Sequence, residues 1–305
     1  MKFFRSLLFV PGNRPDLVEK AHNSGADALI LDLEDSVPIQ KKIESRMLVR
    51  EVLENFGKSI GPIFVRVNGF ETGMTFKDID AILCEGLYGI VIPKVEAPKD
   101  LQIIDEYLKI GERENCLDLN SIETPLVLET APAMHQSFQI AVSSQRIKNI
   151  ILAAGPGGDA ARAIGYQWSK TGIETLFLRS KIVLESRAAK LQPVAVSWWD
   201  IKDLEGLKKD AQFNRQIGFS GMAIIHPSHV PIVNEAFTPT KEEIKNAIEL
   251  IEVMKNAEKS GAGVVQYKGE MVDYAMIKTA EELIEFAYSI GLSDNILMEE
   301  NKGVS

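Results

Sequence analysis

The segment that decides the fold is Asn149-Ile150-Ile151-Leu152-Ala153-Ala154-Gly155-Pro156-Gly157-Gly158-Asp159-Ala160-Ala161. An apolar run, which we interpret as a buried strand, leads into a glycine-rich turn that presents a single carboxylate, Asp159. Because glycine lets a backbone turn sharply and a ligand approach closely, Asp159 is a candidate site residue. The alternative is an ordinary strand-to-helix turn in which Asp159 caps the next helix. The choice depends on whether the pattern recurs.

Short aliphatic runs recur along the chain and alternate with longer charged segments of helical period, such as Pro15–Ser24 and Lys41–Asn55. The eight predicted strands are Ser6–Val10, Ala28–Leu33, Ile63–Val67, Gly89–Ile92, Leu126–Leu128, Asn149–Ala153, Val194–Ser197 and Gly221–Ile225. Eight such units over about 235 residues predict an α/β fold of the (β/α)8 TIM-barrel type. A doubly wound dinucleotide-binding sheet is the alternative, but no G-x-G-x-x-G motif follows the first strand.

The strand pattern stops near Pro239. Beyond it we predict an amphipathic helix at Lys241–Lys259, a short strand at Val264–Tyr267 and a last helix at Thr279–Ile290. The predicted domains are therefore a barrel at residues 1–237 and a C-terminal helical extension at residues 238–305. We expect this extension to be too small for a core of its own, so that it packs on the barrel or on a neighbouring subunit.

The composition limits the possible functions. The 305 residues carry a net charge of -9, which argues against general nucleic-acid binding, since that relies on lysine and arginine. Only two cysteines occur, Cys84 and Cys116, so we predict a reducing, cytoplasmic location. The N-terminal apolar run is short and ends in Pro11-Gly12, so we interpret it as the first strand rather than a signal peptide. Because no apolar run approaches the ~20 residues of a membrane span, no membrane association is expected.

Polar residues stand at or just after the ends of the predicted strands, and in a barrel these ends converge on one face. They are Asp32, Glu34, Asp35, Arg66, Asn68, Lys94, Glu96, Glu129, Asp159 and His226. Acidic side chains interrupted by an arginine and a lysine suit a divalent cation and an anionic substrate better than they suit packing.

Several short segments, spread in order over nearly the whole chain, match one known family. They are Arg5–Asn13, Leu31–Val37, Arg66–Asn68, Ile92–Glu96, Leu128–Thr130, Leu178–Val183, Gly218–Gly221, Ile225–Pro227 and Gly269–Asp273. On these segments the chain resembles the citrate lyase beta subunit-like proteins of the aldolase/citrate lyase superfamily. The resemblance implies a (β/α)8-barrel carbon-carbon lyase that acts on acyl thioesters.

The resemblance also implies roles for individual residues. Glu129 and Asp159 match the carboxylates that hold one Mg²⁺, and Arg66 matches an active-site arginine that holds substrate oxygens. Glu34 and Asp35 match acids of the substrate pocket. Asp273 matches a catalytic acid/base on a C-terminal segment that covers the active site of an adjacent subunit.

Simpler interpretations stay open for these residues. Arg66 would otherwise form a structural salt bridge with Glu34 or Asp35, and those two acids would otherwise cap a helix or face solvent. Asp273 would otherwise be an ordinary turn residue. For His226 a structural role is favoured over a catalytic one. Lys94 either meets the phosphates of a thioester cofactor or pairs with Glu96.

Three departures from the family pattern place the substrate in doubt. Pro156 stands where a glycine usually precedes the metal-binding aspartate, Met134-His135 replaces a small residue, and Tyr274-Ala275 stands where a proline often follows the acid/base. The first could shift Asp159 slightly, and the second could reshape the acyl pocket.

The predicted function is Mg²⁺-dependent cleavage, or formation, of a malyl-, citramalyl- or citryl-type thioester, giving an acetyl thioester and a 2-keto acid. The thioester carrier is either CoA or an acyl-carrier protein, and a homo-oligomer, a trimer or larger, is expected. A malate synthase or thioesterase would use the same parts. A third possibility is a subunit that works only with an acyl-carrier partner, or an inactive relative that binds without turnover.

Overall fold

The computed structural model describes residues 2–259 and 264–292. The chain divides into two compact units, one of residues 4–237 and one of residues 1–3 with 238–305. We call them the barrel unit and the C-terminal unit. Each contains buried apolar side chains of its own.

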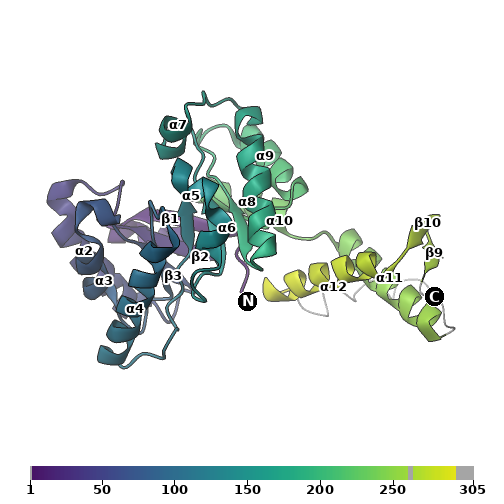
Figure 1. Ribbon diagram of the computed structural model, residues 1–305, viewed down its shortest axis with the longest axis horizontal. Coiled ribbons are helices and arrows are strands. Elements are labelled where there is room, and N and C mark those ends of the chain that lie inside the picture. Colours follow the sequence, from purple (N-terminus) through teal and green to yellow (C-terminus); the bar gives the residue numbers. More distant parts are fainter. Residues whose placement is uncertain (1, 260–263, 293–305) are drawn as a thin grey trace. The chain divides into compact units, whose positions relative to one another are not determined.

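The barrel unit is built on eight parallel strands (Figure 1), namely β1 (Ser6–Pro11), β2 (Ala28–Asp32), β3 (Ile63–Arg66), β4 (Gly89–Val91), β5 (Leu126–Leu128), β6 (Asn149–Leu152), β7 (Gln192–Ala195) and β8 (Gly221–Ile224). The last strand returns to pair with the first, with Leu7 opposite Ala223. Parallel bridges from Gly89 to Glu123 and from Ile92 to Leu126 connect β4 to the chain at β5. The sheet therefore closes, and the predicted eight-stranded parallel barrel is confirmed.

Helices follow the strands and pack on their outer side. They are α1 (Val18–His22), α2 (Lys42–Phe56), α3 (Thr75–Ile82), α4 (Pro98–Glu114), α5 (Ala131–His135), α6 (Ser137–Ala141), α7 (Asp159–Ile164), α8 (Leu176–Ala188), α9 (Leu204–Gln216) and α10 (Val230–Phe237). Short 3-10 helices lie at η1 (Pro15–Leu17), η2 (Ile39–Lys41), η3 (Phe70–Thr72), η4 (Ile173–Thr175) and η5 (Pro227–His229). The predicted Pro15–Ser24 helix is thus divided between η1 and α1, whereas α2 agrees with its prediction to within one residue at each end.

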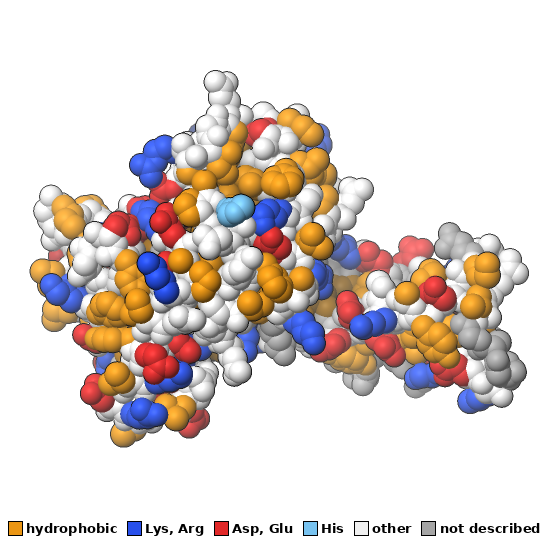
Figure 2. Space-filling model, in the orientation of Figure 1, with side chains coloured by type: hydrophobic (Ala, Val, Ile, Leu, Met, Phe, Trp, Pro, Cys, Tyr) orange, Lys and Arg blue, Asp and Glu red, His pale blue; other side chains and the backbone are white. Residues whose placement is uncertain are grey.

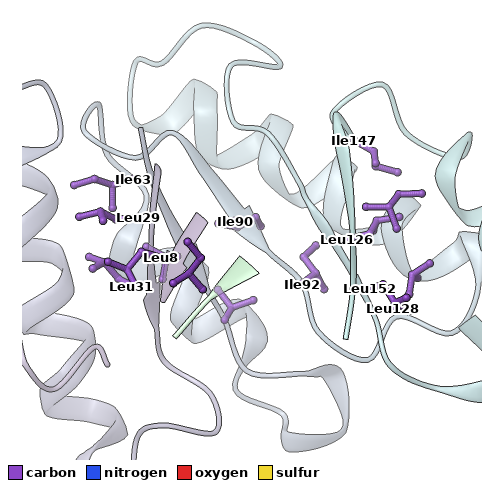
Figure 3. Packing of buried hydrophobic residues seen from close by; sticks show 14 of the residues in the cluster. Leu8, Leu29, Leu31, Ile63, Ile90, Ile92, Leu126, Leu128, Ile147 and Leu152 are labelled. Atoms are coloured by element: carbon purple, nitrogen blue, oxygen red, sulfur yellow. The ribbon is translucent and has the colours of Figure 1, made fainter. Parts of the chain in front are cut away.

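Two apolar layers follow from the alternation of side chains along each strand. On β2, Leu29 and Leu31 point outward into the large cluster between strands and helices (Figure 3). Ile30 points into a second cluster inside the barrel, where it meets residues such as Phe64 and Val127. Burying one such side chain contributes roughly 1.5–3 kcal/mol. The pleat therefore decides which strand residues can reach the barrel interior.

Strand β7 begins at Gln192, two residues before the predicted Val194. The Gln192 side chain accepts a hydrogen bond from the backbone of Phe4 at 3.1 Å and donates one back to its carbonyl at 2.8 Å. Pro193 lacks an N–H, but its carbonyl still accepts a hydrogen bond from Ser220. These long-range contacts extend the strand through a Gln-Pro pair that looks like a strand breaker in the sequence.

The C-terminal unit contains α11 (Lys241–Lys259), the hairpin strands β9 (Val265–Tyr267) and β10 (Glu270–Val272), and α12 (Tyr274–Ser289). Lys268 and Gly269 join the two strands, both with positive φ, as a two-residue hairpin turn of type I′ requires. Met254, Val272 and Ile277 form a small buried cluster. The expectation that this segment has no core of its own is therefore wrong.

Helix α12 starts at Tyr274, five residues before the predicted Thr279. Asp273 is its N-cap, and the carboxylate accepts hydrogen bonds from the backbone N–H groups of Ala275 and Met276. Such a cap satisfies donors that the first turn leaves unpaired.

The surface is mixed in character. The face of the barrel unit drawn in Figure 2 carries acidic and basic side chains interspersed with hydrophobic ones rather than a continuous basic area. Within the ranges that the structure describes, no helix combines the length and apolarity that crossing a membrane requires.

Candidate active site

A cavity of about 440 Å³ opens at the carboxyl ends of the barrel strands. Its lining consists of Phe9, Pro11, Asp32, Asp35, Ser36, Arg66, Val127, Glu129, Ile151, Leu152, Ala153, Gly155, Gly158, Asp159, Val196, Ser197, Trp199, Ala223 and Ile225. The volume is ordinary for a small-molecule site, and ligands of this fold bind at this end of the barrel. The cavity is therefore the candidate active site.

Three charged residues reach the cavity because of the strand pleat. Asp32, Arg66 and Glu129 each stand two positions after a residue of the interior cluster, namely Ile30, Phe64 and Val127. Since side chains alternate along a strand, each charged group points to the same side as its apolar predecessor. The interior of the barrel is thus apolar in its middle and charged at the carboxyl ends of the strands.

Arg66 is fixed by two acids. Its Nε and Nη2 atoms each donate to the carboxylate of Asp32 at 2.7 Å, and its Nη1 lies 2.9 Å from Oε2 of Glu34. Burial opposes ionisation of Asp32, but the charge and hydrogen bonds of Arg66 hold its pKa below the ordinary value. Burial likewise opposes the charge on Arg66, yet Asp32 raises its pKa. The pair is therefore charged on both sides.

Arg66 has the structural role anticipated for it and also lines the cavity. It forms the anticipated salt bridge with Glu34, although its main partner is Asp32. At the same time it lines the cavity and packs over the Phe9 ring, with 5.0 Å from Cζ to the ring centroid. A guanidinium has five N–H donors, so this arrangement leaves donors for a ligand.

Glu34 and Asp35 differ in environment. Glu34 is buried and pairs with Arg66 and with Lys94 Nζ at 3.0 Å, so the solvated and capping interpretations are wrong for it. Burial raises the pKa of Glu34. Asp35 is exposed and lines the cavity. Of these two acids, only Asp35 therefore lines the cavity.

Glu129 directly follows β5, and Asp159 stands at the start of α7, after the loop that follows the neighbouring strand β6. The Glu129 side chain is buried and accepts a hydrogen bond from the Lys94 backbone at 3.2 Å. Burial, together with the charges of Glu34 and Asp159, raises the pKa of Glu129 to about 7. Asp159 begins α7, but Gly158 is the cap residue, so the interpretation of Asp159 as a helix cap is wrong. Its carboxylate lies 3.5 Å from Lys94 Nζ and pairs with Arg162.

This donor set fits Mg²⁺. Within residues 2–259 and 264–292, no three His, Cys, Asp or Glu side chains gather closely enough to form a metal site by themselves. Mg²⁺ commonly takes only one or two protein carboxylates and fills its other positions with water and substrate oxygens. A buried carboxylate with a raised pKa beside a second one gains from a cation, so Glu129 and Asp159 are suitable ligands.

Other strand-end residues have structural partners. Asn68 donates to the Leu33 carbonyl at 3.0 Å and to Asp78 at 2.6 Å. His226 caps η5, and its Nδ1 accepts a hydrogen bond from the Ser228 backbone at 3.2 Å, which agrees with the favoured structural role. Lys94 pairs with Glu34 rather than with Glu96.

The predicted site residues fall into two groups. Asp35, Arg66, Glu129 and Asp159 line the cavity of the barrel unit, and Glu34 pairs with Arg66 beside it. Asp273 belongs to the C-terminal unit and caps α12 there. Its predicted acid/base role stays a prediction.

Sequence reasoning did not single out several residues that line the cavity, among them Phe9, Ser197 and Trp199. Phe9 stands two positions after the interior residue Leu7 on β1, so the period of the strand could have placed it inside the barrel. Ser197 and Trp199 follow β7 in an irregular segment, where no periodicity indicates direction. The Trp199 ring packs so closely on Gly155 that an added Cβ there would lie 2.2 Å from its Nε1.

Several known proteins are similar to this chain. Residues 5–227 match the family model "HpcH/HpaI aldolase/citrate lyase", and residues 175–291 match the model "C-C Bond Lyase of the TIM-Barrel fold". The citrate lyase subunit beta of Leuconostoc mesenteroides subsp. cremoris is 30% identical over 291 residues, which cover 95% of each chain. The mitochondrial citramalyl-CoA lyase of Homo sapiens is 31% identical over 296 residues, which cover 94% of this chain and 86% of that one.

A similar structure has been solved with ligands. The CitE protein of Mycobacterium tuberculosis, in complex with magnesium, acetoacetate and coenzyme A, is 25% identical and superposes with a TM-score of 0.72. The match covers 93% of this chain and 98% of that chain.

Proposed function

Because the chain belongs to the HpcH/HpaI aldolase/citrate lyase family and is a carbon-carbon lyase, we propose that it cleaves a 3-hydroxyacyl thioester into an acetyl thioester and a 2-keto acid with the help of Mg²⁺. The observation that carries this proposal is the arrangement of Arg66, Glu129 and Asp159 around one cavity at the carboxyl ends of the strands. The same site would catalyse the reverse condensation.

Glu129 and Asp159 are the proposed metal ligands. When bound, Mg²⁺ acts as a Lewis acid for the oxygens of the keto acid or hydroxy acid. Glu129 contributes a buried carboxylate oriented by the Lys94 N–H, and Asp159 contributes one from the start of α7. The magnesium named for the M. tuberculosis structure supports this assignment.

Arg66 is proposed to hold substrate oxygens. The Asp32 carboxylate accepts two hydrogen bonds from one edge of the Arg66 guanidinium, so this group keeps a fixed orientation toward the cavity. Donors fixed before the reaction stabilise developing negative charge without reorganisation in the transition state. Glu34 and Asp35 complete the pocket, Glu34 by fixing Arg66 and Asp35 as an exposed wall residue.

Cleavage also needs a group that accepts a proton. A base removes the proton from the substrate hydroxyl, the carbon-carbon bond breaks, and its electron pair forms the thioester enolate, which is then protonated at carbon. We assign the acid/base role to Asp273, on the family resemblance of Gly269–Asp273. In this proposal the C-terminal segment of a neighbouring copy delivers Asp273, so the active form is a homo-oligomer, a trimer or larger.

The lining also favours one kind of keto acid. Arg66 is the one cationic side chain among the described residues that line the cavity, and the walls below it are the apolar Val127, Ile151 and Ala223. Oxaloacetate would bring a second carboxylate, for which no second cation lines the described cavity. Lys94 lies beside the cavity, where Glu34 and Asp159 already pair with it. Malyl- and citramalyl-type thioesters, which release glyoxylate and pyruvate, are therefore the preferred substrates, and the citryl type is the alternative.

The carrier is proposed to be CoA, as in the complex of the M. tuberculosis protein. The similarity to a citrate lyase subunit beta favours an acyl-carrier partner as the alternative. A malate synthase or thioesterase would differ by hydrolysing the condensation product. The cytoplasmic location stays a prediction. Some similar proteins, such as the human citramalyl-CoA lyase, are named as mitochondrial.

A thioester panel tests the proposal. Purified protein is incubated with malyl-CoA, citramalyl-CoA and citryl-CoA, with and without Mg²⁺, and products are identified by mass spectrometry. We expect Mg²⁺-dependent release of glyoxylate or pyruvate with acetyl-CoA as the second product. Free CoA as the product would indicate hydrolysis, and turnover only on an acyl-carrier protein would indicate the partner-dependent subunit. The absence of any metal-dependent turnover would contradict the proposal.

A further inference from the structure

Lys94 has an unusual backbone conformation. It follows β4 and has a φ of 53°, in the left-handed region that lysine rarely adopts. The other described non-glycine residues with positive φ, Cys116, Asn120, Lys190 and Lys268, lie in turns between elements. Lys94 instead stands beside the cavity, and strained residues of this kind persist where the surroundings require them.

The left-handed conformation directs two groups of Lys94 toward carboxylates. Its backbone N–H donates to Oε1 of Glu129 at 3.2 Å. Its Nζ lies 3.0 Å from Oε1 of Glu34 and 3.5 Å from Oδ2 of Asp159. One residue therefore contacts both proposed metal ligands and the acid that fixes Arg66.

The charges in this region are unbalanced. Asp32, Glu34, Asp35, Glu71, Glu129 and Asp159 bring six carboxylates, whereas Arg66, Lys94 and the exposed Arg162 bring three cations. The ammonium of Lys94 acts in opposite directions on Mg²⁺ and on the keto acid, the two small molecules of the proposed site. It repels a metal cation next to Asp159, and it attracts the carboxylate of a keto acid.

We propose that Lys94 is a positioning residue that balances the binding of Mg²⁺ against the binding of the keto acid. Its N–H orients Glu129, and its ammonium weakens Mg²⁺ binding while it strengthens binding of the keto acid. The inference rests on the proposed metal and keto-acid site, and it adds a role for the Lys94 ammonium, to which that site had assigned none. It predicts that removing the ammonium changes the two affinities with opposite signs.

Isothermal titration calorimetry of the full chain tests this prediction. Mg²⁺ is titrated into wild type and Lys94→Met, and pyruvate is then titrated at saturating Mg²⁺. Pyruvate alone serves as the keto-acid probe, so no thioester is needed. For Lys94→Met we expect about tenfold tighter Mg²⁺ binding and about tenfold weaker pyruvate binding, a Coulomb effect of modest size. Lys99→Met, which removes the charge of an exposed lysine on α4, should change neither value.

Lys94→Gly separates the charge from the backbone. Glycine adopts positive φ freely and keeps the N–H that contacts Glu129, so this variant should fold even if Lys94→Met does not. It should show the same opposite shifts. Unchanged affinities, or weaker binding of both ligands, would overturn the proposal and leave only a structural pairing with Glu34.

The outcomes also distinguish this proposal from the proposed lyase function. Opposite shifts in a protein that cleaves none of the tested thioesters would support the role of Lys94 and contradict the lyase proposal. Thioester cleavage with unshifted affinities would do the reverse.

Discussion

Glu129→Gln should stabilise the metal-free protein while it removes metal binding. The side chain is 6% exposed, and the pKa of Glu129 is raised from 4.5 to about 7, by burial first and by Glu34 and Asp159 second. A rise of this size corresponds to about 3 kcal/mol of unfavourable free energy when the group is charged. Glutamine keeps the shape and the oxygen that accepts from Lys94 but carries no charge, so it avoids this cost.

The pH dependence of the effect follows from the sign of the shift. A carboxyl group whose pKa is higher in the folded state destabilises that state once the unfolded chain ionises, so the cost is absent below about pH 4.5, grows up to pH 7 and is constant above. The gain for Glu129→Gln should therefore be close to zero at pH 4.5 and reach about 3 kcal/mol at pH 8. For a domain of this size it would raise the Tm by roughly 5 °C or more.

Thermal unfolding in EDTA at the two pH values, followed by addition of Mg²⁺ at pH 8, measures both effects. Mg²⁺ should raise the Tm of wild type by mass action and leave that of Glu129→Gln unchanged. Glu96→Gln, which removes the same charge from an exposed position, should behave as wild type. Equal stability of wild type and Glu129→Gln at pH 8, or an equal Mg²⁺ response, would refute the reasoning.

Three further variants test other parts of the barrel. Arg66→Lys keeps the charge but loses the two-point contact with Asp32, so steady-state kinetics should show a higher KM for the keto acid and a kcat lower by about 10- to 100-fold. Arg146→Met leaves the Glu112 carboxylate buried without the guanidinium that donates to it at 2.7 Å, so urea unfolding at pH 7 should show a loss of about 3–5 kcal/mol. Gly155→Ala displaces the half-exposed Trp199 ring, so stability should change by less than about 1 kcal/mol while the KM for the keto acid changes.

The part of the site that could be predicted is the part that strand geometry controls. Asp32, Arg66 and Glu129 continue the period-two pattern of their strands by one step, so a correct strand boundary already places them inside the barrel. The barrel itself was predicted from eight repeated βα units. The observed ends of its strands differ from the predicted ends by at most two residues. In the barrel strands, the period-two pattern of the sequence and the tertiary packing place the same side chains inside.

The remainder depends on contacts that no local pattern contains. Lys94 acquires its partners through a left-handed backbone conformation that lysine does not favour. Trp199 reaches the cavity from an irregular segment and depends on the missing side chain of Gly155. The early start of α12 depends on a cap, Asp273, that the sequence also allows to be a turn residue.

The carboxylates of the barrel unit leave few candidates for the acid/base. Asp32 is held by Arg66, Glu34 is buried between Arg66 and Lys94, and Glu129 and Asp159 are assigned to the metal. Asp35 is the exposed carboxylate that remains in the described cavity lining, so it is the direct competitor of Asp273. Asp273→Asn should lower kcat by about 100-fold or more without weakening Mg²⁺ binding, whereas Asp35→Asn should not lower kcat to this extent.

Mixed oligomers decide whether Asp273 acts on a neighbouring copy. Asp273→Asn and Glu129→Gln chains are each expected to be inactive, and they are unfolded and refolded together in equal amounts. If each site combines the barrel of one copy with the C-terminal segment of another, about a quarter of the sites recover both intact residues, and activity should return to about that fraction of wild type. Asp273 acting within its own chain would leave the mixture inactive, because every chain carries one of the two substitutions. Refolded wild type sets the scale, so recovered activity well below a quarter of that value would contradict a shared site.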